Sequence, residues 1–131
     1  MTDELPNSLS IKLHILPDDY TVCQISNPSD ICFEEEFVFV GKTDDELSLV
    51  CRTASVPASV LAREDGWKAI KIQGVLDFSL VGILAGIAAI LAGQQISIFA
   101  VSTYNTDYIL LKSACLLDAE TALKDNGCLF V

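Results

Sequence analysis

A short polar turn between two apolar segments holds the side chains best suited to binding chemistry in this 131-residue chain. Residues 96–101 are mainly apolar, residues 102–107 are polar, and the chain becomes apolar again over residues 108–111. The turn offers hydroxyl, amide and carboxylate groups but no histidine, cysteine or lysine. Nucleophilic catalysis needs a base beside the nucleophile. The turn is therefore better suited to holding a small zwitterion than to breaking a bond.

A second binding feature lies upstream, where residues 75–93 form a glycine-containing loop that opens an apolar helix. Free N–H groups at a helix start can hold a carboxylate, and Gly82 would let a ligand approach the backbone closely. Asp107 can pair with an ammonium or guanidinium group. A structural alternative stays open: Asp107 caps its own turn, Asn105 is the left-handed turn residue, and Gly82 and Gly86 only bring the helix close to a sheet.

The order of the surrounding elements predicts how these features are positioned. Hydrophobic periodicity predicts a strand at 67–73, a helix at 79–92 capped by Ser79 and ending at a left-handed Gly93, strands at 96–102 and 108–112, a helix at 117–125 and a strand at 128–131. The order βαββαβ is that of a ferredoxin-like unit, an α+β fold with helices on one face of an antiparallel sheet.

The first half of the chain resembles a shortened copy of the second. We expect strands at 9–16 and 20–25, a turn or helix start at 27–30, a hairpin of 37–40 with 47–52, and a short helix at 56–65. A gapless alignment of residues 37–51 with 98–112 sets Phe37 against Ile98 and Glu46 against Asp107. The alignment indicates a duplication, with units at 1–65 and 66–131.

Composition excludes several classes of function. The net charge of −10 argues against nucleic acid, which needs a basic face. The acidic clusters at 18–19, 34–36 and 44–46 are interpreted as solvated loops and strand ends, with a cationic ligand or metal as the alternative. The longest apolar stretch, residues 80–93, is shorter than the roughly 20 residues that a membrane helix requires. The acidic, polar start of the chain is unlike a secretory signal, so a cytoplasmic protein is expected.

Five cysteines and one histidine limit the chemistry further. The cysteines are odd in number, and no two have the spacing Cys-x-x-Cys, which favours free thiols in a reducing compartment. His14 is the only imidazole, and it lies far in sequence from every polar cluster. A metal site, a cofactor and enzymatic activity are therefore not expected.

Residues 66–113 resemble the ACT domain. The resemblance rests on Leu-Asp-Phe-Ser-Leu-Val-Gly-Ile-Leu-Ala at 76–85 and Ser-Thr-Tyr-Asn-Thr-Asp-Tyr at 102–108, and residues 45–51 extend it to the first half. The chain is most similar to small bacterial tandem-ACT proteins related to the CASTOR arginine sensors. This resemblance implies two ferredoxin-like units in tandem, the first shortened. It also implies a non-catalytic regulatory module that binds an amino acid and usually dimerises.

The resemblance also implies where a ligand would lie, between the loop before the first helix and the hairpin of a neighbouring ACT unit. It assigns ligand-binding roles to Asp77, Phe78, Ser79, Val81, Gly82, Ile83, Thr103, Tyr104, Asn105, Thr106 and Asp107. The arginine sensors carry an acidic residue where this chain has Leu80, so arginine itself is not implied. The expected partners are a small amino acid and a second copy of the chain. The alternative is a ligand-free interaction or oligomerisation module.

Overall fold

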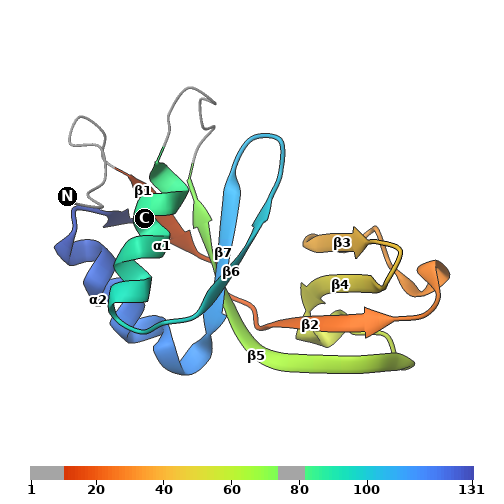
Figure 1. Ribbon diagram of the computed structural model, residues 1–131. Helices are drawn as coiled ribbons and strands as arrows, with labels where there is room; N and C mark the ends of the chain where they lie inside the picture. The colour runs from red at the N-terminus through yellow and green to blue at the C-terminus, as the bar shows by residue number, and fades with distance from the viewer. Residues whose placement is uncertain (1–10, 74–81) are drawn as a thin grey trace. The chain divides into compact units, whose positions relative to one another are not determined.

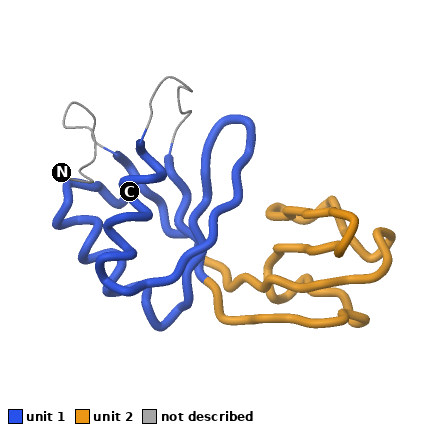
Figure 2. Tube along the Cα trace, viewed as in Figure 1, with its two compact units in different colours: residues 1–16, 68–131 blue, residues 17–67 orange. Residues whose placement is uncertain are grey.

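The computed structural model describes residues 11–73 and 82–131. The chain divides into two compact units, which Figure 2 distinguishes by colour: unit 1 comprises residues 1–16 and 68–131, and unit 2 comprises residues 17–67. The chain therefore passes between the units twice, after Leu16 and after Trp67. Each unit has its own apolar core.

Unit 1 contains two helices and five strands in its described part. Its elements are β1 (Lys12–Ile15), the second half of β5 (Val60–Ile72), α1 (Ile83–Gly93), β6 (Ile98–Ser102), β7 (Asp107–Lys112), the short 3-10 helix η3 (Ser113–Cys115), α2 (Leu116–Asp125) and β8 (Leu129–Phe130). The strands are ordered β6-β7-β5-β1-β8 (Figure 1). From β5 to β8 the order is βαββαβ, as the sequence predicts.

The sheet of unit 1 holds one strand more than a ferredoxin-like sheet, because β1 lies between β5 and β8. Leu13 pairs with Ile72 in an antiparallel register and with Phe130 in a parallel one. Sequence reasoning grouped this strand with the residues that follow it up to 65. Alternation along a single strand gives its buried face but not its neighbours, and here the fully buried Leu13 joins the core of unit 1.

Both helices cover the same face of this sheet and bury a continuous apolar core. The core comprises Ile11, Leu13, Ile70, Ile72, Ile83, Ile87, Leu91, Ile96, Ile109, Leu111, Ala119, Leu123 and Cys128. In α1, Ile83, Ile87 and Leu91 follow the expected helical spacing. Burying a side chain of this size stabilises the fold by about 1.5–3 kcal/mol.

The ends of α1 differ from those predicted. The helix begins at Ile83, with Gly82 as its N-cap in the left-handed region at φ 88°, and Ser79 lies outside the described residues. At the other end Gly93 is the last helical residue. The left-handed position falls two residues later, on Gln95 at φ 60°. Helical hydrogen bonding thus extends beyond the glycine that composition suggested as its end.

Unit 2 is built from strands and short 3-10 turns, and residues 17–67 contain no α-helix. Its elements are β2 (Tyr20–Ile25), η1 (Pro28–Asp30), β3 (Val38–Lys42), β4 (Leu47–Arg52), η2 (Thr53–Ser55) and the first half of β5, with the strands ordered β3-β4-β2-β5. One face of this sheet buries Cys23, Ile25, Leu49 and Cys51. Ile31 and Val56, from the turns, pack on that face.

The helix predicted at 56–65 is wrong, because most of that segment belongs to β5. Gln24 pairs with Ala62, and Cys23 pairs with Arg63, along the edge of β2 that does not face β4. Gly66 looks like a helix stop in the sequence, but at φ 88° it forms a bulge opposite Thr21. Pairing with a neighbouring strand outweighs the weak local preference.

Candidate functional site

The polar turn between β6 and β7 is closed by Thr103 and Thr106. The Thr103 N–H donates to the Thr106 carbonyl at 2.9 Å, and the Thr106 N–H donates to Thr103 Oγ1 at 3.3 Å. Asn105 is exposed and is not left-handed, since Gln95 is the one non-glycine residue with positive φ in the described part of the chain. The left-handed alternative for Asn105 is therefore wrong. Tyr104, 82% exposed, is held at the tip.

A buried hydrogen bond ties this turn to the end of β5. Thr106 is 7% exposed, and its hydroxyl donates to the Ile72 carbonyl at 2.5 Å. Ile72 is the last residue of β5, and the segment that leads to α1 leaves the strand immediately afterwards. The hydrogen bond therefore fixes the predicted hairpin beside the start of the predicted loop, although the two are more than thirty positions apart.

Asp107 lies on the face of the sheet that carries the helices. Side chains alternate along a strand, so Asp107 shares a face with the core residues Ile109 and Leu111. Its Oδ1 accepts a hydrogen bond from Ser102 Oγ at 2.5 Å across the hairpin. This bond orients the half-buried carboxylate and uses one of its two oxygens. The described residues give its other oxygen no hydrogen bond, so a cationic group can pair with it.

The start of α1 offers backbone donors rather than side chains. The first intrahelical hydrogen bond runs from the Gly86 N–H to the Gly82 carbonyl at 2.7 Å. The preceding N–H groups of the first turn therefore have no intrahelical partner. Ile83 is 3% exposed and packs in the core, so its side chain faces away from solvent. The predicted site residues Asp77, Phe78, Ser79 and Val81 lie outside the described residues.

Unit 2 contains a hairpin built in the same way. Val38 pairs with Cys51 as Ile98 pairs with Leu111, sixty positions later. The Thr43 N–H donates to the Glu46 carbonyl at 3.0 Å, matching the bond that Thr103 donates. The short helices η2 and η3 then follow at the same spacing.

This register corrects the sequence alignment by one residue. The residue of the β3–β4 hairpin that is equivalent to Ile98 is Val38, not Phe37. Glu46 is therefore equivalent to Thr106, and Leu47 to Asp107. Two hairpins of similar composition can be aligned one residue apart without a penalty visible in sequence. Only hydrogen-bond register identifies the equivalent positions, because a one-residue slip exchanges the two faces.

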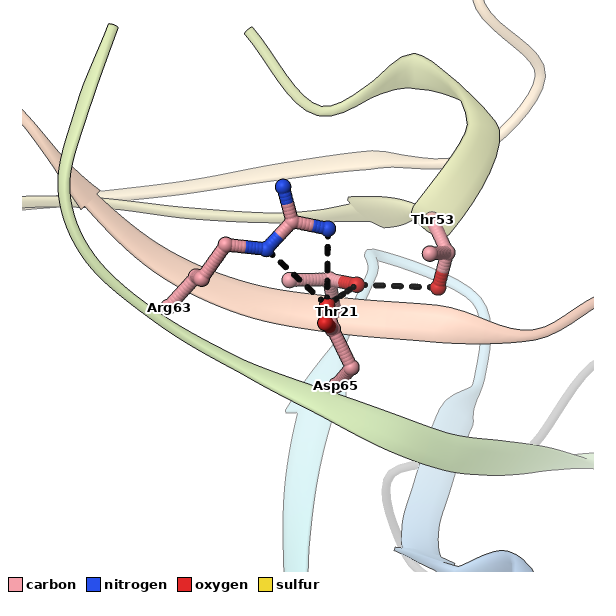
Figure 3. Close-up of polar contacts among 4 residues, drawn as sticks. All are labelled: Thr21, Thr53, Arg63 and Asp65. Atoms are coloured by element: carbon pink, nitrogen blue, oxygen red, sulfur yellow. Dashed lines mark hydrogen bonds and ion pairs between the residues drawn. The ribbon is translucent and has the colours of Figure 1, made fainter. Parts of the chain in front are cut away.

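A polar network in unit 2 was missed by sequence reasoning (Figure 3). The fully buried Thr21 donates to Asp65 Oδ1 at 2.6 Å and lies 2.9 Å from the hydroxyl of Thr53. Since Thr21 has one hydroxyl proton, Thr53 donates to Thr21. Arg63 donates to the same oxygen of Asp65 from Nε and Nη2, at 3.2 and 2.9 Å. Both threonine hydroxyls and the shared Asp65 oxygen are hydrogen-bonded to one another or to Arg63. The network therefore stabilises the bulge at Gly66 rather than forming an open site.

A second clamp in unit 2 organises the acidic cluster at 34–36. Arg52 donates to Glu35 Oε1 from Nε at 3.2 Å and from Nη2 at 2.6 Å, and the hydroxyl of Ser55 donates to the same oxygen. The hydrogen bond from Ser55, followed by that from Arg52, lowers the pKa of Glu35. Within the acidic cluster, Glu35 therefore holds its loop against the end of β4.

Comparison with known proteins agrees with this geometry. Residues 62–125 match the family model of the ACT domain, and residues 18–59 match a model described as an N-terminal domain. The chain is 31% identical to protein Atu0741 of Agobacterium tumefaciens, covering 94% of this chain and 93% of that one, with a TM-score of 0.83. The chain therefore belongs to the ACT-domain family. No curated protein sequence matches it.

Two further solved structures share the fold. A Vibrio cholerae protein of unknown function, described as a possible transport protein, is 22% identical over 90% of this chain and 91% of that one, with a TM-score of 0.70. The ligand-free regulatory subunit of aspartate kinase from Thermus thermophilus is 10% identical over 87% of this chain and 96% of that one, with a TM-score of 0.61. This fold therefore also occurs in a regulatory subunit of aspartate kinase.

None of the helices in the described part of the chain has the length and apolar character that a membrane crossing needs. In the same residues no group of three or more histidine, cysteine, aspartate or glutamate side chains is placed to hold a metal ion.

Proposed function

We propose that the chain is a non-catalytic regulatory module that binds a small amino acid where unit 1 meets another ACT unit. The carrying observation is the hydrogen bond from Thr106 to the Ile72 carbonyl, because it holds the polar turn beside the origin of the loop that precedes α1. In this proposal the N–H groups at the start of α1 receive the ligand carboxylate. Asp107 pairs with its ammonium group.

The proposal gives the described site residues different roles. The hydroxyl of Thr103 bonds within the turn, and that of Thr106 bonds the Ile72 carbonyl of β5. Both residues therefore shape the site instead of contacting the ligand. Tyr104 and Asn105 remain exposed and accessible from outside the unit. Asp77, Phe78, Ser79 and Val81 complete the site from the loop, and Gly82 and Ile83 contribute backbone.

We further propose that the chain carries two ACT units in tandem, the first degenerate, at 1–65 and 66–131 except that β1 joins the sheet of the second. We also propose that it acts as a homodimer. The equivalent registers of the β3–β4 and β6–β7 hairpins support the duplication. Likeness to the CASTOR-type sensors extends to the architecture but not to arginine, since the expected acid is replaced by Leu80.

The test is the melting temperature of the full chain against each of the twenty amino acids at millimolar concentration. A ligand bound only by the folded state stabilises it by RT ln(1 + [L]/Kd), about 2.7 kcal/mol at a hundred times Kd. One amino acid, or a small chemically related group, is expected to raise the midpoint. If none does, the amino-acid proposal fails and a ligand-free interaction module replaces it.

A further inference from the structure

The sheet of unit 1 has a basic face, which is the face without helices. Leu13, Ile72 and Phe130 point into the helix-covered core, so their strand neighbours point the other way. The register places His14 opposite Lys71, and Lys12 opposite Leu129. We define the basic face as Lys12, His14, Lys71, Leu129 and Val131.

The basic face is both charged and apolar, and its lysines have no ionic partner among the described residues. Neither Lys12 nor Lys71 has a hydrogen-bond or ion-pair partner for its ammonium group among residues 11–73 and 82–131. His14 lies 2.9 Å from the Val131 carbonyl through Nδ1, which orients its ring. Leu129 and Val131 are 49% and 59% exposed. In a chain with 18 acidic and 8 basic residues, two unpaired lysines beside exposed aliphatic side chains favour an anionic, partly apolar partner.

The same chain contains a segment with the complementary chemistry. We define the acidic loop as residues 32–36 of unit 2. Phe33 in this loop is 73% exposed, and Glu34 and Glu36 are exposed with no hydrogen-bond or ion-pair partner in the described residues. Glu35 is clamped by Arg52 and Ser55. The clamp orders the loop before any partner arrives, which lowers the entropic cost of binding.

Most of the negative charge of the chain lies in unit 2, the unit that contains the acidic loop. Unit 2, residues 17–67, carries eleven acidic and three basic residues, a net charge of −8. The remaining seven acidic and five basic residues give unit 1 a net charge of −2. Long-range electrostatics therefore orient an approaching copy so that its unit 2 meets the basic face.

We propose that the basic face of one copy binds the acidic loop of a second copy. In a two-fold dimer each such contact is made twice, which closes the assembly. Packing two basic faces together would instead place like charges opposite each other, which is repulsive. The contact includes none of the residues assigned to amino-acid binding, since Asp107 lies on the other face of the sheet. The proposal goes beyond the homodimer proposed above by naming its contact surfaces, and it is tested without ligand so that its outcome does not depend on amino-acid binding.

The test is sedimentation velocity of the full chain without ligand at 50 and 500 mM salt. The expected result is a dimer whose dissociation constant rises with salt. Lys71→Glu and Glu36→Lys should each raise the dissociation constant at least tenfold. In the double variant, the increase in the logarithm of the dissociation constant should be at most half of that in the single variants. Lys42→Glu, which changes an exposed lysine outside both surfaces, should leave it within twofold.

Phe33→Ser provides a second variant that reverses no charge. It should weaken the dimer at both salt concentrations, because it removes the apolar part of the contact. A monomeric wild-type chain at 50 mM salt, or a double variant no tighter than the single ones, would overturn the proposal. Melting curves confirm that each variant is folded before it is compared.

Discussion

Gln95 and Gly127 occupy the same position of the same helix-ending motif. After α1 the Gln95 N–H donates to the Ala92 carbonyl and the Ile96 N–H to the Leu91 carbonyl, at 2.9 and 3.0 Å. After α2 the N–H groups of Gly127 and of the next residue make the equivalent bonds, both at 3.0 Å. This is the Schellman arrangement, in which the residue after the cap is left-handed. The two φ angles, 60° for Gln95 and 94° for Gly127, agree with it.

Gln95→Gly should therefore stabilise the protein. A left-handed conformation costs a residue with a Cβ about 1–2 kcal/mol, and glycine avoids most of that cost. Part of the gain is offset by the greater freedom of glycine in the unfolded chain. We expect the free energy of unfolding in urea to rise by up to about 1 kcal/mol. Gly127→Ala is the matched reverse change and should lower it by a similar amount.

Thr106→Val should destabilise the fold and loosen the hairpin. The substitution keeps the shape of the side chain but leaves the Ile72 carbonyl without its 2.5 Å partner, at a cost of about 1–3 kcal/mol. Thr121→Val is the control, because its exposed hydroxyl donates to the Leu117 carbonyl at 3.0 Å in a helix where water can substitute. Equal losses for both variants in urea unfolding would contradict a special role for Thr106.

Asp107→Ala should abolish the ligand-dependent rise in melting temperature and leave the fold intact. The carboxylate is half-buried at the end of the hairpin, and among the described residues its removal costs the fold only the bond from Ser102. Asp45→Ala, in the turn of unit 2, is the control and should retain the full rise. If Asp107→Ala unfolds instead, Asp107 has a structural role and the proposed ion pair loses its support.

Alkylation by iodoacetamide should separate the cysteines by burial. Cys32 is exposed, whereas Cys23, Cys51 and Cys128 are buried. Burial raises the pKa of all three buried thiols, that of Cys51 to about 11. At pH 8 peptide mass spectrometry should find Cys32 modified well before Cys51, since the thiolate is the nucleophile. Modification of Cys51 at the rate of Cys32 would show that unit 2 opens readily.

The same pKa shift predicts how stability depends on pH. Unfolding returns Cys51 to its ordinary pKa near 9.0, so between pH 9 and about 11 the unfolded state binds fewer protons than the folded state. The contribution of this thiol to stability is complete below pH 9 and declines as pH rises. Cys51→Ala should reduce that decline when unfolding in urea is compared at pH 8 and pH 10.

Hydrophobic periodicity was sufficient to predict the helices and strands whose own residues show a clear pattern. The strand β2, the two hairpins and the helices α1 and α2 appear in the structure close to their predicted ranges. Each has a clear apolar period and polar turns at its ends. The segment at 56–65 has no clear period and only a weak local preference for helix, and pairing with β2 decided its conformation.

The candidate site divides in the same way. Residue types and the ACT resemblance selected the 103–107 turn from the sequence, but not which of its groups are already engaged. The structure assigns the hydroxyl of Thr106 to Ile72 and that of Ser102 to Asp107. A side chain that stabilises the fold and one that awaits a ligand can be the same residue type, so sequence does not separate them.

The sequence by itself determined the family, the βαββαβ order and the place of the polar turn, because these depend on periodicity and on short contiguous motifs. Tertiary structure alone decided that β1 lies between β5 and β8, that the two hairpins match at Val38 and not Phe37, and that two lysines share a face with Leu129 and Val131. These relationships join residues far apart in the chain. Strand register and the choice of neighbouring strand determine these relationships. Neither can be inferred from the sequence of a single strand.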